Sequence, residues 1–241
     1  MLKIYDFWEG LAPSKRPQSK SYKNVLVHIS DKLTVAKLHF FVYVAGILEP
    51  YLTCYQGDGP MLPFMCDDIT KFYKALLNIV VKPKVLQKCK TSFDLISVEL
   101  GSDTLIEDEK IHLGFAAEEE IRKQGAEVDQ KSILALRSAA KNLVIAVCEK
   151  LDEKNPLSYI IVRNAICFKP KSIVEKKQGN LGERFKKLMK KLVSLKVMES
   201  AKADCALAQY KDFLAMECIQ HKDLLLSFDR KSKRLDTLFF P

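Results

Sequence analysis

The chain has 241 residues, of which 48% are hydrophobic, and a formal net charge of +9 at pH 7. This composition excludes a disordered tail, because a chain of this length can bury one large core or two smaller ones. The longest apolar run, 39–48, is shorter than the roughly 20 residues that a bilayer crossing requires, and charged residues interrupt the apolar start of the chain. We therefore expect no membrane span, no secretory signal and an intracellular, reducing compartment.

The first part of the chain predicts helices separated by proline and glycine breaks. Residues 2–11 form an amphipathic start, and the basic segment 12–21 that follows contains two prolines, which indicates an exposed linker. A short helix is expected over 22–29, and Asp31 suits the N-cap of a long helix over 32–48. The apolar positions that keep helical spacing in this long helix are 35, 38, 41, 42 and 45.

After the break formed by Gly57, Gly59 and Pro60, Pro63 suits the first turn of a helix that ends near residue 81. Segment 91–112 fits either a short strand or a helical turn. The remaining predicted helices are 115–124, 129–151, 156–168, 182–198 and 201–226. The sequence thus predicts an all-α protein, an irregular bundle of about eight helices, with residues 1–20 as N-terminal helix and linker and 21–241 as one helical domain.

Charge is distributed unevenly along the chain. Segment 101–130 has nine acidic and three basic residues, whereas segment 169–200 has ten basic and three acidic residues. Such a basic block indicates either a solvated helix face or a surface for polyanions, and composition alone favours the solvated face.

The predicted helix 182–198 separates its apolar and basic residues. Its apolar side, with Phe185, Leu188, Met189, Leu192 and Leu195, is expected to join the core. No aromatic residue interleaves with the lysines on the other side, so base stacking is not expected, and any readout would be of the nucleic-acid backbone. The candidate DNA-binding residues are Arg184, Lys186, Lys187, Lys190, Lys191 and Lys196.

Catalytic chemistry has little support in the residues themselves. Asp67 and Asp68 suggest metal-dependent phosphoryl transfer, but adjacent helical residues point about 100° apart, so we expect acids of a first helical turn that face the helix dipole. The consecutive acids 118–120 predict a solvated helix face. No histidine accompanies a recognisable local nucleophile signature. We expect no catalytic residue, no cofactor and no small-molecule substrate.

The seven cysteines are odd in number and widely spread, which favours reduced thiols, several of them in the core. Cys205, Cys218 and His221 match no closed metal-site pattern, and no C-x-x-C pair exists. No metal site is therefore expected.

Five collinear blocks resemble the central region of transposon-derived proteins of the hAT transposase superfamily: 14–22, 37–68, 80–90, 156–170 and 234–240. The resemblance implies that the chain is mostly the all-helical insertion that interrupts the ribonuclease-H-like core of those proteins. It also implies that the upstream strands with two catalytic aspartates and the downstream segment with a glutamate are missing. Cys218 and His221 have the spacing of the family's C-x-x-H motif but lie near the opposite end, so that role is not transferred.

Three functions follow as expectations. The first is a nuclear, catalytically incomplete transposase relative that retains at most binding to the backbone of double-stranded DNA through the Lys186–Lys191 face. The second is a protein-interaction or self-association module, a homo-oligomer in which segment 101–130 and the basic helix dock partners. The third, an active nuclease that uses Asp67 and Asp68, is the least favoured.

Overall fold

The computed structural model describes residues 10–16, 18–57, 59–175, 181–217, 220–230 and 232–235. This part of the chain contains twelve α-helices and no strand, and an isolated antiparallel bridge joins Val81 to Leu105. The all-α prediction is confirmed, with more helices than the expected eight. Segment 91–112 contains a short helix and the bridge residue but no strand. Residues 2–9 of the predicted start and residues 236–241 lie outside the described residues, and residues 10 and 11 form no helix.

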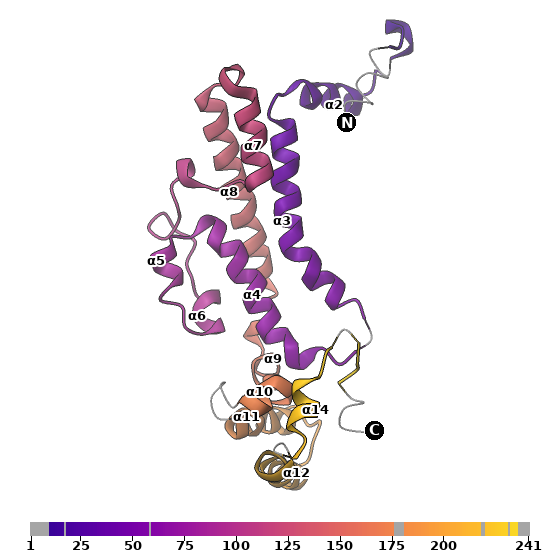
Figure 1. Cartoon of the computed structure of the whole chain (residues 1–241), viewed down its shortest axis with the longest axis vertical. Helices are drawn as coiled ribbons and strands as arrows, with labels where there is room; N and C mark the ends of the chain where they lie inside the picture. Colours follow the sequence, from indigo (N-terminus) through magenta and orange to yellow (C-terminus); the bar gives the residue numbers. More distant parts are fainter. Residues whose placement is uncertain are drawn as a thin grey trace.

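The helices fall into an upper and a lower group in Figure 1, joined by α4. The upper group comprises α2 (Lys20–Ser30), α3 (Thr34–Cys54), α4 (Leu62–Val80), α5 (Pro83–Leu86), α6 (Ser92–Ile96), α7 (Phe115–Gln124) and α8 (Gln130–Glu153). The lower group comprises α9 (Ile160–Asn164), α10 (Pro170–Glu175), α11 (Leu181–Ser194), α12 (Ser200–Asp212) and α14 (Lys222–Leu226). The chain also contains short helical turns: η1 (Pro13–Lys15), η2 (Asp108–Lys110), η3 (Gly125–Glu127), η4 (Pro156–Ser158), η5 (Ala165–Phe168) and the π-helical η6 (Phe213–Glu217).

The upper core forms around α4, whose apolar residues recur every three or four positions and so occupy one face. Leu76, Leu77 and Val80 on this face are fully buried. They belong to a core that includes Phe40 of α3 and Val144 of α8. Pro63 lies in the first turn of α4, as predicted, because its missing N–H would have no partner there.

Helix α3 corrects two predictions. It begins at Thr34 and continues through Pro50 to Cys54, so the predicted end at residue 48 is wrong. A proline ring inside a helix crowds the residue four positions earlier, which is Gly46 here, and Figure 1 shows α3 bending in its C-terminal part. Asp31 is not the N-cap of α3; it ends α2, and its carboxylate accepts a hydrogen bond from the N–H of Leu33 at 2.9 Å.

The buried face of α3 is not the one whose spacing the sequence singled out. Ala36, Phe40 and Val44 are buried, whereas Phe41 and Val42 are 62% and 65% exposed. The other predicted positions, 35, 38 and 45, are exposed as well. Because α3 is apolar nearly all round, its pattern cannot indicate which side meets the core.

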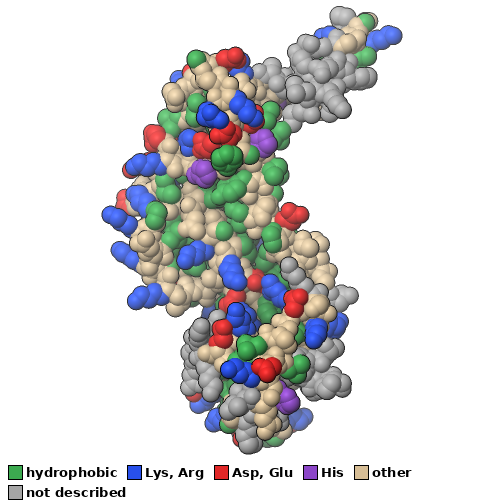
Figure 2. Space-filling view, in the orientation of Figure 1, with side chains coloured by type: hydrophobic (Ala, Val, Ile, Leu, Met, Phe, Trp, Pro, Cys, Tyr) green, Lys and Arg blue, Asp and Glu red, His purple; other side chains and the backbone are tan. Residues whose placement is uncertain are grey.

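Among the described helices, α3 alone is long and apolar enough, by length and composition, to cross a membrane. Core helices of soluble proteins meet the same criterion, so the expected absence of a membrane span stays a prediction. Figure 2 shows hydrophobic side chains gathered over the upper helices, on the face turned to the viewer.

The close packing of α7 on α3 depends on a glycine. Gly114 precedes α7 with φ of 87°, a left-handed conformation that L side chains rarely adopt. A Cβ at this position would also lie 2.9 Å from the ring of Tyr43 in α3. Gly114 therefore allows the chain to turn into α7 directly against α3, and α7 has the predicted bounds, 115–124.

The lower core is a second, separate cluster. Phe185, Leu188 and Met189 of α11 pack with Tyr210 of α12 and Cys167 of η5. The rings of Phe185 and Tyr210 are stacked, with centroids 4.2 Å apart. The Tyr210 hydroxyl donates a 2.7 Å hydrogen bond to the carbonyl of Cys167. Of the two arrangements that the length allows, one large core or two smaller ones, the described residues form two cores.

Two predicted long helices are broken in this lower group. Segment 156–168 is divided into η4, α9 and η5, with Tyr159 and Ile160 exposed, so it is not one buried helix. Segment 201–226 contains α12, the π-turn η6 and α14. Short helical pieces change the direction of the chain, which lets this small core be enclosed from several sides.

Candidate nucleic-acid interface

Helix α11 forms because its sequence is strongly amphipathic. Leu181, Phe185, Leu188 and Met189 are buried, and Leu192 is partly buried against the same core. The predicted apolar side is confirmed except at Leu195, which is 49% exposed because the helix has ended at Ser194. The lysines consequently point away from the lower core.

A groove of about 1230 Å³ lies between α11 and a wall made by α6, α9 and part of α4. It is larger than the roughly 300–1,000 Å³ typical of small-molecule sites. Four of the six predicted DNA-binding residues line it: Arg184, Lys187, Lys190 and Lys191. Lys186 and Lys196 do not line it. The structure therefore brings part of the predicted set together on one wall.

Helical geometry explains why the predicted set divides. Residues 187, 190, 191 and 194 lie within one side of the helix, whereas Lys186 is turned about 100° from Lys187. Lys196 lies beyond the helix and has a φ of 56°. Its N–H bonds to the carbonyl of Val193 at 2.9 Å, and the N–H of Val197 bonds to that of Leu192 at 3.0 Å, the pattern of a Schellman turn.

The opposite wall adds cations that sequence reasoning missed. Lys90, just before α6, and Arg163 of α9 both line the groove. With the four residues of α11 they make six basic side chains, against the two acidic side chains Asp67 and Glu183, a formal excess of four positive charges. These residues are far apart in the sequence, so no local pattern could have joined them.

The two arginines have structural partners. Arg163 donates to the carbonyl of Ser158 at 2.8 Å and also to that of Leu157. Arg184 donates to the carbonyl of Arg163 at 2.9 Å and so fastens α11 to α9. The arginines thus hold the groove walls together. Lys187, Lys190 and Lys191 form no ion pair within the described residues, which leaves their charges available to a ligand.

The acidic segment 101–130 is different, because most of its carboxylates are paired within the chain. Glu118 binds Arg137 of α8 at 2.7 Å, and Asp108 binds Lys141 at 2.7 Å. Four further acids pair with Lys32, Lys110, Arg122 and Lys123. The side chains of 118–120 are 21–31% exposed, so the predicted solvated acidic face is partly exposed, and each of its carboxylates is paired with a cation.

Phe93 is an aromatic side chain in this groove. It lies in α6, is 59% exposed, and takes part in neither hydrophobic core. Its helix is fixed by a capping box in which the Thr91 hydroxyl accepts from the N–H of Asp94 at 3.1 Å, and the Asp94 carboxylate accepts from the N–H of Thr91 at 2.8 Å. We predicted from the sequence that no aromatic residue interleaves with the lysines of α11. The fold nevertheless places Phe93, from a distant part of the chain, in the same groove as these lysines.

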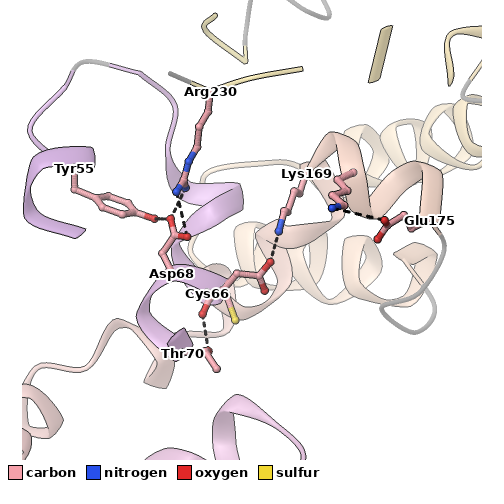
Figure 3. Close-up of polar contacts among 9 residues, drawn as sticks. Tyr55, Cys66, Asp68, Thr70, Lys169, Glu175 and Arg230 are labelled. Carbon is pink, nitrogen blue, oxygen red and sulfur yellow. Dashed lines mark hydrogen bonds and ion pairs between the residues drawn. The ribbon is translucent and has the colours of Figure 1, made fainter. Parts of the chain in front are cut away.

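Asp67 and Asp68 lie in the second turn of α4, not the first, so the prediction that they face the helix dipole is wrong. Each carboxylate instead meets a cation from a distant part of the chain: Asp67 pairs with Lys169, and Asp68 pairs with Arg230. Figure 3 shows Asp68 between the Tyr55 hydroxyl, which donates at 3.0 Å, and the Arg230 guanidinium. Burial and the neighbouring Asp68 raise the pKa of Tyr55 above its ordinary value.

These two aspartates point to separate partners, as their adjacency on a helix predicts. Arg230 also lies over the ring of Phe64, with 5.2 Å to the centroid. The ion pairs of the two aspartates join α4 to the lower part of the molecule, and the two carboxylates do not face a common space. It therefore favours a structural role over the nuclease hypothesis.

The six described cysteines are unpaired thiols, and Cys148 and Cys167 are fully buried, as their apolar surroundings predicted. Burial raises the pKa of each of these two thiols to about 12, which makes them poor nucleophiles at neutral pH. Within the described residues no group of three metal-ligating side chains occurs. Cys218, one of the three residues Cys205, Cys218 and His221 considered as metal ligands from the sequence, lies outside the described residues.

Comparisons of the chain with protein-family models, with curated proteins and with solved structures found no match.

Proposed function

We propose that this protein is a catalytically incomplete relative of the hAT transposases that acts in the nucleus by binding DNA through its phosphate backbone. The binding surface is the basic groove, defined as the groove lined by Lys90, Lys187, Lys190 and Lys191 together with Arg163 and Arg184. Lysines that neutralise phosphates release condensed counterions, which drives binding and makes it depend on salt.

The observation that carries this proposal is the contrast between the paired acids and the unpaired lysines. Exposed Lys187 and Lys190 could have formed ion pairs at little cost, yet none is present within the described chain, whereas six carboxylates of segment 101–130 are paired. A concave surface with several like charges attracts a polyanion more strongly than the same charges spread over a convex surface.

Two double variants with the same net charge test the proposal. Lys187→Glu/Lys190→Glu reverses two groove charges, and Lys186→Glu/Lys196→Glu reverses two charges outside the groove; each lowers the formal net charge from +9 to +5. Fluorescence anisotropy with labelled duplex DNA is measured at several salt concentrations. We expect the groove variant to bind about tenfold or more weakly, with the log–log salt slope reduced by about 2, and the control variant to change less.

Equal losses in the two variants would show that net charge alone governs binding, and absence of binding by the wild-type chain to both duplex and single-stranded DNA would refute the proposal. A defined oligomer that ignores nucleic acid would support the second candidate function, protein interaction or self-association. The exposed apolar side chains Val35, Leu38, Phe41 and Val42 of α3 favour that candidate, since such faces often bind proteins.

A further inference from the structure

We propose that the ligand of the basic groove is a single-stranded nucleic acid, one base of which stacks on the ring of Phe93. This inference rests on the proposed function, because it takes the groove as the binding surface, but it changes the form of the ligand from a duplex to a strand with accessible bases. It concerns the shared chemistry of DNA and RNA, a phosphate backbone that carries unstacked bases.

Phe93 is an exposed ring that lies among basic side chains. An exposed phenylalanine on a surface is common, but this one lines a groove with Lys90, Lys187, Lys190 and Lys191. Backbone cations combined with an aromatic platform are the recurring composition of sites for single strands. Ile160, 42% exposed, adds a further apolar surface within the same groove.

The backbone of Phe93 is held in place, although its ring takes part in neither hydrophobic core. The same short helix buries Leu95, which is 3% exposed, and its start is fixed by the Thr91–Asp94 capping box. Leu95 anchors the helix to the upper core, so the ring of Phe93 contributes little to packing. Because the backbone of this helix is fixed, only the two side-chain torsions of Phe93 lose freedom when a base stacks on its ring.

An intact duplex would use less of this groove than a single strand. In a duplex the base faces are covered by neighbouring base pairs, and only phosphates, sugars and groove edges are accessible to a protein. A duplex could use the lysines but would leave the Phe93 ring in water. A single strand can use both, because every base has a face that stacks on an aromatic ring.

The test compares Phe93→Ala with Phe115→Ala in the full chain. Phe115 is 79% exposed and is not among the residues that line the groove, so the second variant removes the same ring from another place. The probes are a labelled oligothymidylate, an oligouridylate, an oligonucleotide of equal length whose sugars lack bases, and a duplex. Anisotropy gives each affinity, and ultraviolet cross-linking followed by mass spectrometry locates the contacted side chain.

We expect Phe93→Ala to weaken binding of the base-bearing single strands about tenfold, and to leave binding of the baseless strand and the duplex unchanged. Phe115→Ala should change none of the four. Cross-links should include the peptide that contains Phe93. The oligothymidylate and oligouridylate arms then decide between DNA and RNA, since only the sugar hydroxyl and a base methyl differ.

Tighter binding of the duplex than of the single strands, with no effect of Phe93→Ala on any probe, would overturn this inference and leave the proposed function intact. Absence of binding to every probe would refute both. An equal loss for the baseless and base-bearing strands would also overturn the stacking contact, because the ring would then be acting only through the shape of the groove. Phe93→Trp should retain binding if stacking is the interaction.

Discussion

At the scale of single residues, Lys196 has a strained left-handed backbone conformation at the end of a helix. The Schellman turn after α11 requires a left-handed residue at this position, and glycine is the usual choice because it lacks a Cβ. Lysine adopts the conformation at a cost of roughly 1–2 kcal/mol. Its positive charge near the C-terminus of the helix offsets a part of that cost.

We therefore predict that Lys196→Gly raises the free energy of unfolding by about 1 kcal/mol, measured by urea denaturation. Lys196→Ala is the matched control, because alanine removes the same charge but keeps a Cβ and should bring no gain. A glycine variant no more stable than the alanine variant would show that the left-handed conformation is not strained in the folded chain. Neither variant should weaken binding in the groove, since Lys196 does not line it.

At the scale of elements, α3 is the helix whose orientation the sequence leaves open. Phe40 and Phe41 are neighbours with identical side chains, yet they are 3% and 62% exposed. Phe40 packs in the upper core, whereas Phe41 faces outward beside Val42. A difference this large between adjacent positions makes the orientation of α3 measurable.

We predict that Phe40→Ala lowers the free energy of unfolding by about 3–5 kcal/mol, because it leaves a cavity in the upper core. Phe41→Ala should change it by no more than about 0.5 kcal/mol in the monomer. Thermal or urea unfolding at low protein concentration measures both. Reversed magnitudes would mean that α3 is rotated relative to its neighbours. A large effect of Phe41→Ala that grows with protein concentration would instead indicate self-association through this face.

At the scale of the whole molecule, two hydrophobic cores are joined along α4. Helix α4 contacts α9 and η5, and the two ion pairs of Asp67 and Asp68 connect it to segments more than 100 residues later. The Asp68 side chain is 14% exposed and its partner Arg230 is 29% exposed, so the pair is partly shielded from water. Such a pair contributes mainly because removal of one partner leaves the other charge uncompensated.

We predict that Asp68→Asn lowers the free energy of unfolding by about 1–3 kcal/mol, because Arg230 and the Tyr55 hydroxyl then lose a charged acceptor. Glu153→Gln breaks the exposed pair with Lys150 and is the control, with an expected change below about 0.5 kcal/mol. Urea denaturation measures both. Full stability of Asp68→Asn, together with a loss of metal-dependent strand cleavage, would favour the nuclease hypothesis over the structural role.

The amino-acid sequence by itself determined the helical class, the proline and glycine breaks, and the amphipathic α11, because these depend on local propensity and on the spacing of apolar residues. It also located most of the cations that line the groove on α11. The tertiary structure alone decided which face of α3 is buried, since a helix that is apolar all round carries no directional signal. It alone paired Asp108 and Glu118 of the acidic segment with α8 and Glu127 with Lys32. It also divided the lysines into groove and outer positions and placed Phe93 and Lys90 opposite α11. Those relations join residues up to about 100 positions apart, and only the packing of the two cores brings them together.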